Sequence, residues 1–379
     1  LLEDGLGDTI RVSLTEEPEY EIPVAKSLVD RYAHRKEHEK IAVKTDFDLS
    51  PFEYQPRKTN SVLNIGGDNV PRVMADLALE PQINRDTLTQ LGYQYFEAED
   101  KWGIGDFACD YIFVNKKSVD FDIPGTLGVV QAYSVWKDNK LPQHYPQINA
   151  TEYLEKSSFH SQLNFIYITL EDLTEKLITK LKNDPTAVLL IDTYNEHGMA
   201  EQRRLFMELM SENCQIPVII GKAYGDLTPE NLQLYSATDM GALLIDGLGD
   251  GVFIEAEGCG SLEQVNQTAF GILQASRTRI SKTEYISCPS CGRTLFDLQE
   301  TTALVRNRTS HLKGIKIGIM GCIVNGPGEM ADADYGYVGT GVGKISLYRG
   351  QNVVQANLPM EEAVDALIDL MKEDGVWVE

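Results

Sequence analysis

Short apolar runs recur between residues 60 and 250, and they constrain the fold more than any other feature. Polar, helix-compatible sequence separates each run from the next. Continuous apolar runs are typical of strands that are buried on both faces, as in parallel sheets. Several of them end in glycine or a polar residue. The runs are Val62–Ile65, Tyr111–Val114, Leu127–Val130, Phe165–Ile168, Ala187–Ile191, Pro217–Ile220 and Ala242–Ile245.

This pattern predicts an α/β domain followed by a smaller α+β domain. Seven strand–helix units within fewer than 200 residues favour a TIM-barrel-like fold. A doubly wound open sheet is the alternative, because periodicity does not separate the two. After residue 283 the pattern changes to a helix, a strand, a hairpin-like pair and a last helix, as in an α+β domain. A chain of 379 residues is long enough for two or three domains.

An eight-residue segment occurs twice with one difference. Residues 1–8 (LLEDGLGD) recur as residues 243–250 (LLIDGLGD), and a strand-like run follows each copy. This match favours a duplication, in which residues 9–14 would be a barrel strand. Arg11 and Ser13 of the first copy align with Phe253 and Glu255 of the second. If the guanidinium of Arg11 and the hydroxyl of Ser13 bind an anion, the second copy is not expected to bind it, because a ring and a carboxylate replace those two groups.

Composition excludes some classes of partner. The formal net charge of −23 argues against nucleic acid as a ligand. No apolar run reaches the length of a membrane span, so a membrane is not expected either. The six cysteines are too sparse for a disulfide scaffold, which favours a reducing compartment.

Three of the cysteines cluster near the C-terminus and form a candidate metal site. Cys288 and Cys291 make a Cys-x-x-Cys turn, and Cys322 precedes a turn that ends in Glu329. The pair alone favours half of a zinc ribbon. A thioredoxin-like redox pair would need a preceding βαβ unit. Adding the third thiol and the carboxylate favours an iron–sulfur cluster with one unusual ligand.

The two cysteine segments also bring a family resemblance. Residues 287–294 (SCPSCGRT) and 320–329 (MGCIVNGPGE) closely resemble the 4-hydroxy-3-methylbut-2-enyl diphosphate synthases of the non-mevalonate isoprenoid pathway. Residues 4–13 (DGLGDTIRVS) resemble the loop and last strand of that family's catalytic barrel. Members of a longer, three-domain branch carry an inserted domain between the catalytic barrel and the cluster domain.

The resemblance implies roles for particular residues. Cys288, Cys291, Cys322 and Glu329 match the ligands of a [4Fe–4S] cluster, and Glu329 would also act in catalysis. Asn325 matches a catalytic residue beside the cluster. On the same basis, Arg11 and Ser13 match positions that bind the substrate's diphosphate.

The implied reaction is reductive ring opening of 2-C-methyl-D-erythritol 2,4-cyclodiphosphate with loss of water, which makes the chain an iron–sulfur oxidoreductase. Flavodoxin or ferredoxin would supply the electrons. The implied compartment is the bacterial cytoplasm, or the plastid stroma in a plant or alga. A zinc-stabilised binding module joined to a barrel is the competing function.

The resemblance also implies a domain division. Residues 1–18 would hold the last strand of a catalytic (βα)8 barrel, 19–282 the inserted TIM-barrel-like domain and 283–379 the cluster domain. Because the family's first seven catalytic strands have no counterpart in this sequence, we expect a C-terminal portion that binds a cluster and converts little or no substrate alone.

Overall fold

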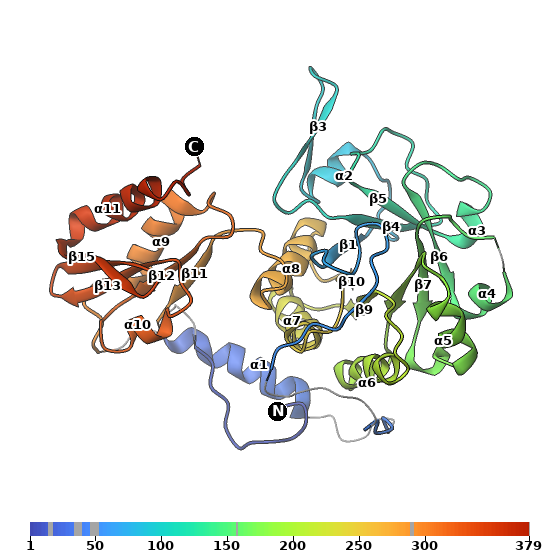
Figure 1. Cartoon of the computed structure of the whole chain (residues 1–379), viewed down its shortest axis with the longest axis horizontal. Helices are drawn as coiled ribbons and strands as arrows, with labels where there is room; N and C mark the ends of the chain where they lie inside the picture. The colour runs from blue at the N-terminus through green and yellow to red at the C-terminus, as the bar shows by residue number, and fades with distance from the viewer. Residues whose placement is uncertain (14–17, 34–39, 46–52, 157, 289–291, 379) are drawn as a thin grey trace. The chain divides into compact units, whose positions relative to one another are not determined.

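The structure is a computed structural model that describes residues 1–379 except 14–17, 34–39, 46–52, 157, 289–291 and 379 (Figure 1). The chain divides into two compact units. One comprises Arg35–Arg279, and the other comprises Leu1–His34 together with Ile280–Glu379. No helix in the described part of the chain is long and apolar enough to cross a membrane.

The larger unit is a closed barrel of eight parallel strands, which confirms the TIM-barrel-like prediction over the open sheet. From β4 to β10, each strand pairs with the strand that follows it along the chain. Strand β1 closes the ring by pairing with both β4 and β10. The strands are β1 (Arg72–Asp76), β4 (Tyr111–Asn115), β5 (Gly128–Ala132), β6 (His144–Asn149), β7 (Asn164–Ile168), β8 (Ala187–Ile191), β9 (Val218–Gly225) and β10 (Gly251–Glu257).

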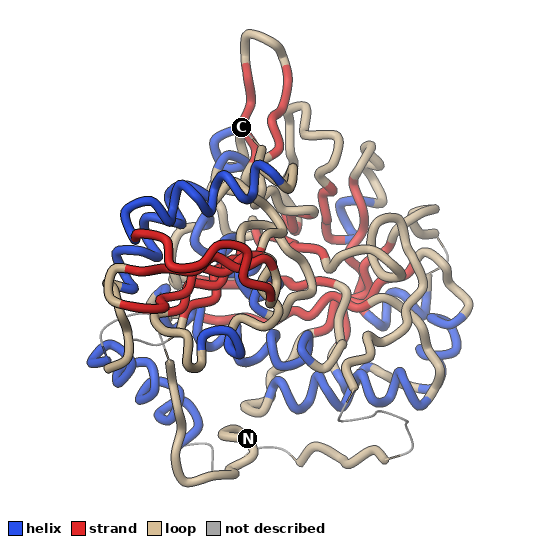
Figure 2. Tube along the Cα trace, turned by 60° about the vertical axis from the view of Figure 1, so that its left-hand side comes forward, coloured by secondary structure: helices blue, strands red, loops and turns tan. Residues whose placement is uncertain are grey.

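Helices surround the ring, and a two-stranded hairpin projects from it between β1 and β4 (Figure 1 and Figure 2). The hairpin consists of β2 (Tyr93–Phe96) and β3 (Lys101–Ile104). The helices are α2 (Arg85–Thr89), α3 (Tyr133–Trp136), α4 (Ala150–Glu155), the 3₁₀ turn η2 (Leu170–Asp172), α5 (Glu175–Lys182), α6 (Gly198–Ser211), α7 (Pro229–Ile245) and α8 (Leu262–Ala275).

Two of the predicted strands are wrong. Residues 62–65 contribute only the isolated bridge between Val62 and Ile65, and the first barrel strand is β1 instead. Residues 242–245 form the last turn of helix α7, because a four-residue apolar run looks the same in a buried helix as in a strand. Helix α8 begins after a capping box formed by Ser261 and Gln264, which the Ser-x-x-Gln spacing indicates.

The barrel has two apolar cores, one inside the ring and one between the strands and the helices. Alternate residues of each strand point to opposite faces. On β10, Phe253 therefore fills the interior, whereas Val252 and Ile254 pack outward. The floor of the interior is largely aromatic, with Phe113 and Phe253 in an edge-to-face pair whose centroids are 5.7 Å apart.

The smaller unit contains a five-stranded mixed sheet in the order β11–β12–β13–β14–β15. The first three strands are parallel and the last three antiparallel. Its elements are η1 (Pro18–Tyr20), α1 (Glu21–Ala33), β11 (Glu284–Ser287), α9 (Leu298–Thr309), β12 (Lys316–Met320), α10 (Gly326–Glu329), β13 (Tyr335–Gly341), β14 (Lys344–Arg349), β15 (Asn352–Pro359) and α11 (Met360–Glu373).

The two faces of this sheet carry separate apolar clusters. Ile317 and Ile319 face the cluster that includes side chains of α9 and α11. Met320 faces the opposite side, where it packs in a smaller cluster with Met330 and Val338. An α+β fold of this kind was predicted for the C-terminal segment, including the hairpin formed by β13 and β14.

The two copies of the repeated segment share backbone conformation as well as sequence. Gly5 and Gly247 have φ of +72° and +77°, and the second glycine of each copy also has a positive φ. Leu6 N–H donates to Leu1 O as Leu248 N–H donates to Leu243 O. Both copies therefore have the hydrogen-bond pattern of a glycine-capped helix end. Residues 9–13, after the first copy, are coil and pair with no strand of the described chain, and their place in a catalytic barrel stays a prediction.

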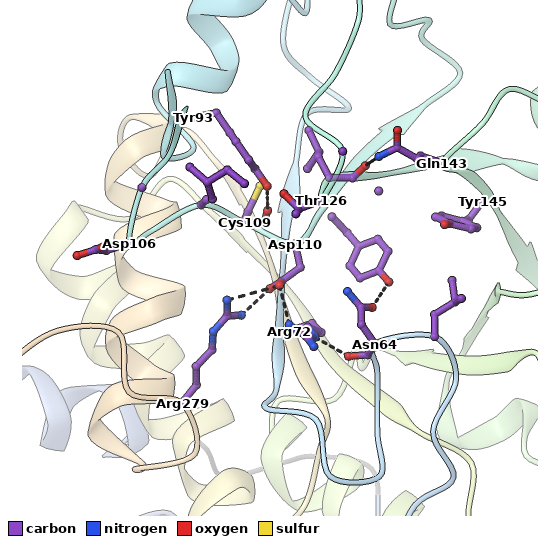
Figure 3. A pocket seen from close by; sticks show the side chains of 18 residues that line it. Asn64, Arg72, Tyr93, Asp106, Cys109, Asp110, Thr126, Gln143, Tyr145 and Arg279 are labelled. Atoms are coloured by element: carbon purple, nitrogen blue, oxygen red, sulfur yellow. Dashed lines mark hydrogen bonds and ion pairs between the residues drawn. The ribbon is translucent and has the colours of Figure 1, made fainter. Parts of the chain in front are cut away.

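A buried carboxylate holds the amino-terminal end of the barrel (Figure 3). Asp110, which directly precedes β4, accepts hydrogen bonds from Val73 N–H at 2.8 Å and from Arg72 Nη1 at 3.1 Å. It also pairs with Arg279 Nη1 at 2.5 Å, and Arg279 is the last residue of the unit. One carboxylate thus joins β1, β4 and the end of the segment that follows α8.

We expect the substitution Asp110→Asn to lower the free energy of unfolding of the barrel by about 2–3 kcal/mol, because two largely buried guanidinium groups would lose their counter-charge. Hydrogen-exchange mass spectrometry of peptides from β1 and β4 during urea unfolding would measure this. Asp68→Asn is the matched control, since Asp68 is exposed and should change stability by less than about 0.5 kcal/mol. Equal effects of the two variants would contradict the assignment.

Candidate metal centre

Two cysteines lie at the same edge of the sheet because two neighbouring strands run parallel. In the register of β11 and β12, Ser287 lies opposite Ile319. Cys288 follows directly after β11, and Cys322 follows two residues after the end of β12. Carboxyl ends of parallel strands share one edge of a sheet, so the two thiols are brought to that edge.

A hydrogen bond connects the two cysteine segments. Gly321 N–H donates to Cys288 Sγ at 3.2 Å, directly before Cys322. Cys288 is half-buried and packs on the small cluster that includes Met320 and Val338, and Cys322 is also half-buried. Neither is in a disulfide. N–H donors to sulfur favour the thiolate form that binds metals.

Cys291 lies outside the described residues, but the chain that follows it returns to the Cys322 turn. Leu295 N–H donates to Gly321 O at 3.0 Å. A Cβ built on Gly321 would lie 2.8 Å from Thr294 Cγ2, so glycine is needed for this contact. The segment after the first cysteine pair is therefore held against the third cysteine.

Glu329 ends the short helix α10, which begins at Gly326. Its N–H donates to Asn325 O at 3.0 Å, and the side chains of both residues are exposed. Within the described residues, no three histidine, cysteine or acidic side chains are grouped closely enough to hold a metal. The structure therefore brings Cys288 to the Cys322 turn and leaves the predicted four-ligand set as a prediction.

Helix α10 lies close to the sheet because two glycines face it, a feature that the sequence reasoning missed. A Cβ on Gly318 of β12 would lie 2.6 Å from Met330 Cβ. A Cβ on Gly336 of β13 would lie 2.5 Å from Met330 Cε. Glycine within a strand indicates such a close approach, and this signal was present in the sequence. The packing of Met330 against these two glycines therefore sets the backbone position of its neighbour, Glu329.

The glycines around the site are of two kinds. Cβ atoms on Gly321 and Gly326 would clash with neighbouring side chains, the latter at 2.7 Å from Met320 Cβ. No described atom lies within 4 Å of a Cβ built on Gly292 or Gly328, and both residues are exposed, so packing against the described chain does not require glycine at either position.

Arg11 and Ser13 are exposed on the coil formed by residues 9–13. In the described chain neither side chain has a hydrogen bond or ion pair to the cysteine segments. Their predicted role in binding a diphosphate stays a prediction.

We expect Gly326→Ala to lower the free energy of unfolding of the smaller unit by about 1–3 kcal/mol, because the added methyl overlaps Met320. Gly328→Ala is the matched control two residues along the same helix, and it should leave stability unchanged or slightly raised, because its Cβ meets no atom. Hydrogen exchange of peptides from β12 and β13 would measure both. A larger loss for Gly328→Ala would refute the distinction.

Comparison with known proteins agrees with the resemblance. Residues 284–373 match the family model described as the GcpE protein C-terminal domain. A protein of Parabacteroides distasonis named 4-hydroxy-3-methylbut-2-en-1-yl diphosphate synthase (flavodoxin) is 44% identical over 378 residues, which cover 100% of this chain and 58% of that protein. Proteins of the same name from Leptospira interrogans and Chlorobaculum tepidum are each 35% identical, over 60% and 57% of their lengths respectively and over 100% of this chain.

The chain thus spans less than two thirds of the length of these relatives. Its whole length nevertheless aligns with them, and both cysteine segments lie within residues 284–373, the part matched by the family model. The chain is therefore similar along its whole length to part of the 4-hydroxy-3-methylbut-2-en-1-yl diphosphate synthases, and its C-terminal part matches the GcpE protein C-terminal domain.

Proposed function

We propose that Cys288, Cys291, Cys322 and Glu329 hold a [4Fe–4S] cluster. The observation that carries this proposal is the hydrogen bond from Gly321 N–H to Cys288 Sγ, which ties the first cysteine to the turn of the third. The donor set also supports it, because three cysteines and one carboxylate suit a cluster better than a zinc ribbon, which needs a second Cys-x-x-Cys or a Cys/His pair.

The cluster would supply electrons and a Lewis-acidic iron to an oxygen of the substrate. A carboxylate ligand would dissociate from its iron more easily than a thiolate ligand. Glu329 suits that position, because its side chain is exposed and only its backbone is fixed by Asn325. In this proposal Asn325 lies beside the reacting oxygen, and Arg11 and Ser13 bind the diphosphate.

The proposed activity is that given in the relatives' names, formation of 4-hydroxy-3-methylbut-2-en-1-yl diphosphate with flavodoxin as donor. The substrate would be 2-C-methyl-D-erythritol 2,4-cyclodiphosphate. Two electrons and two protons break the ring C–O bond and release one oxygen as water, which leaves the linear diphosphate. Ferredoxin is the alternative donor, and the cytoplasm of a bacterium is the compartment we propose.

We also propose the domain division 1–18, 19–282 and 283–379, with the barrel inserted between a catalytic barrel and the cluster domain. The described barrel strands and their helices, from Arg72 to Ala275, fall within the second segment. The inserted barrel would act as a spacer that lets the two catalytic parts of one chain meet. A tight dimer with active sites shared between chains would argue against this role.

Metal analysis tests the cluster. After anaerobic reconstitution we expect brown protein with about four iron and four sulfide per chain. Cys322→Ser should lose most of the iron, whereas Cys259→Ser should keep it, because Cys259 is buried in the barrel. Glu329→Ala should still bind the cluster but lose it faster in air. One zinc per chain and no colour would support the zinc-stabilised binding module instead.

Turnover tests the catalytic part of the proposal. With a reductant and the cyclodiphosphate, we expect the cluster-loaded 379-residue chain to form product no faster than its Cys322→Ser variant, because the chain covers only 57–60% of the length of the relatives that carry this name. Chromatography of the phosphorylated product is the measurement. Product formation above the variant's rate would show that this chain is catalytically complete.

A further inference from the structure

A cavity of about 460 Å³ opens at the carboxyl ends of the barrel strands. Its floor is the interior aromatic pair Phe113 and Phe253, and its walls include Tyr167 and Tyr194. Ligands of TIM barrels bind at this end of the strands, and the volume suits a small molecule. The cavity lies within the larger unit and is separate from the cysteine segments.

Three strands place carboxylates at this mouth. Ala75 of β1 lies opposite Ile254 of β10, so the next residues, Asp76 and Glu255, lie on neighbouring strands at the same level. Asp192 follows directly after β8 and is only 5% exposed. Asp192 and Glu255 line the cavity, and Asp76 is close enough to act on the charge of Glu255.

Two of these carboxylates have donors within the barrel and the third does not. Asp192 accepts from Tyr167 Oη at 2.7 Å and from Thr193 N–H at 2.7 Å. Asp76 accepts from Ala78 N–H at 2.8 Å. Among the described residues, no donor lies within hydrogen-bonding distance of the carboxylate of Glu255.

No cationic side chain compensates for this charge inside the cavity. The described residues that line it include no lysine, arginine or histidine. Lys222 of β9 pairs with Asp239 at 3.0 Å. Lys117 attracts Asp76, but its Nζ donates to backbone carbonyls, one of them Leu77 O at 3.3 Å. Glu152 of α4 also lines the cavity, and it pairs with Lys156 at 2.5 Å. The charge that the described barrel leaves unpaired is therefore that of Glu255.

We propose that this mouth binds a small organic cation, with an ammonium or guanidinium group between the carboxylates and its carbon skeleton on the tyrosine rings. Aromatic faces attract such cations as well as their apolar surface. A metal ion fits less well, because the described acidic side chains here do not group as metal ligands. The aligned positions of the repeat carry Arg11 and Ser13, so the second copy has replaced cationic and neutral groups by a ring and a carboxylate.

The protonation of Glu255 gives the proposal a pH signature. Burial, together with the charges of Asp76 and Asp192, raises the pKa of Glu255 from 4.5 to about 7. The repulsion in the folded barrel is therefore largest above pH 7 and disappears as Glu255 takes up a proton below it. A bound cation favours the carboxylate, so binding near neutral pH should release a proton and weaken as the pH falls. Glu80, which also faces Asp76, adds to the negative charge.

Calorimetric titration with agmatine, which carries one guanidinium and one ammonium, tests this. We expect saturable 1:1 binding at about pH 8 and weaker binding at about pH 5.5. Near pH 7, heats in two buffers of different ionisation enthalpy should reveal proton release. Glu255→Gln should weaken binding by about tenfold or more. Glu257→Gln, two residues along β10, exposed and outside the cavity lining, should leave the affinity unchanged.

Thermal unfolding of the variants distinguishes a loss of binding from a loss of folding. Glu255→Gln removes the repulsion, so its Tm at about pH 8 should equal or exceed that of the unsubstituted chain. Equal affinity in the two glutamine variants would overturn the proposal, and so would absence of saturation at about 10 mM agmatine. Tighter, Glu255-dependent binding of magnesium or calcium would overturn the choice of an organic cation.

Discussion

The parallel pairing of β11 with β12 is the contact on which the metal centre depends. It brings two segments, separated in sequence by a helix and a loop, to one sheet edge, and the hydrogen bond from Gly321 to Cys288 Sγ joins them there. Antiparallel pairing would have put the two thiols at opposite ends of the sheet. The apolar cluster beneath Cys288 also continues under α10 through Met330. The position of the third cysteine therefore follows from this strand pair, whereas α10 and Glu329 also depend on the pairing of β12 with β13.

The ligand types proposed for this centre rest on sequence alone, because thiols in a Cys-x-x-Cys turn with a third cysteine suit few cofactors. The position of α10 beside them could not be predicted in this way. The height of α10 above the sheet depends on the absence of side chains at Gly318 and Gly336, which belong to different strands. Sequence shows each glycine separately, and only the register of β12 and β13, in which Gly318 lies opposite Gly336, shows that they make one surface.

The barrel shows the same limit. Its class was predictable because β7, β8 and β9 are apolar on both faces, as parallel strands between helices must be. Strand β6 was missed because His144–Asn149 is largely polar and contains Pro146, which sequence rules assign to strand edges. In the closed ring, β6 is paired with β5 on one side and with β7 on the other. These neighbours therefore set the register that the sequence of β6 does not specify by itself.

Alternation along the strands connects the fold to the charge at the barrel mouth. On β10 the interior side chains are Phe253 and then Glu255, so the aromatic floor and the unpaired carboxylate are consecutive inward positions of one strand. The aligned positions of the first copy are Arg11 and Ser13, which lie on a coil in the structure. A substitution at an inward position near the end of a barrel strand can therefore change the charge at the barrel mouth. The core between strands and helices is unaffected, because the side chains that pack on the helices are the alternate, outward-facing ones. A carboxylate introduced at such a position would therefore change the class of ligand without altering the outward residues that pack on the helices.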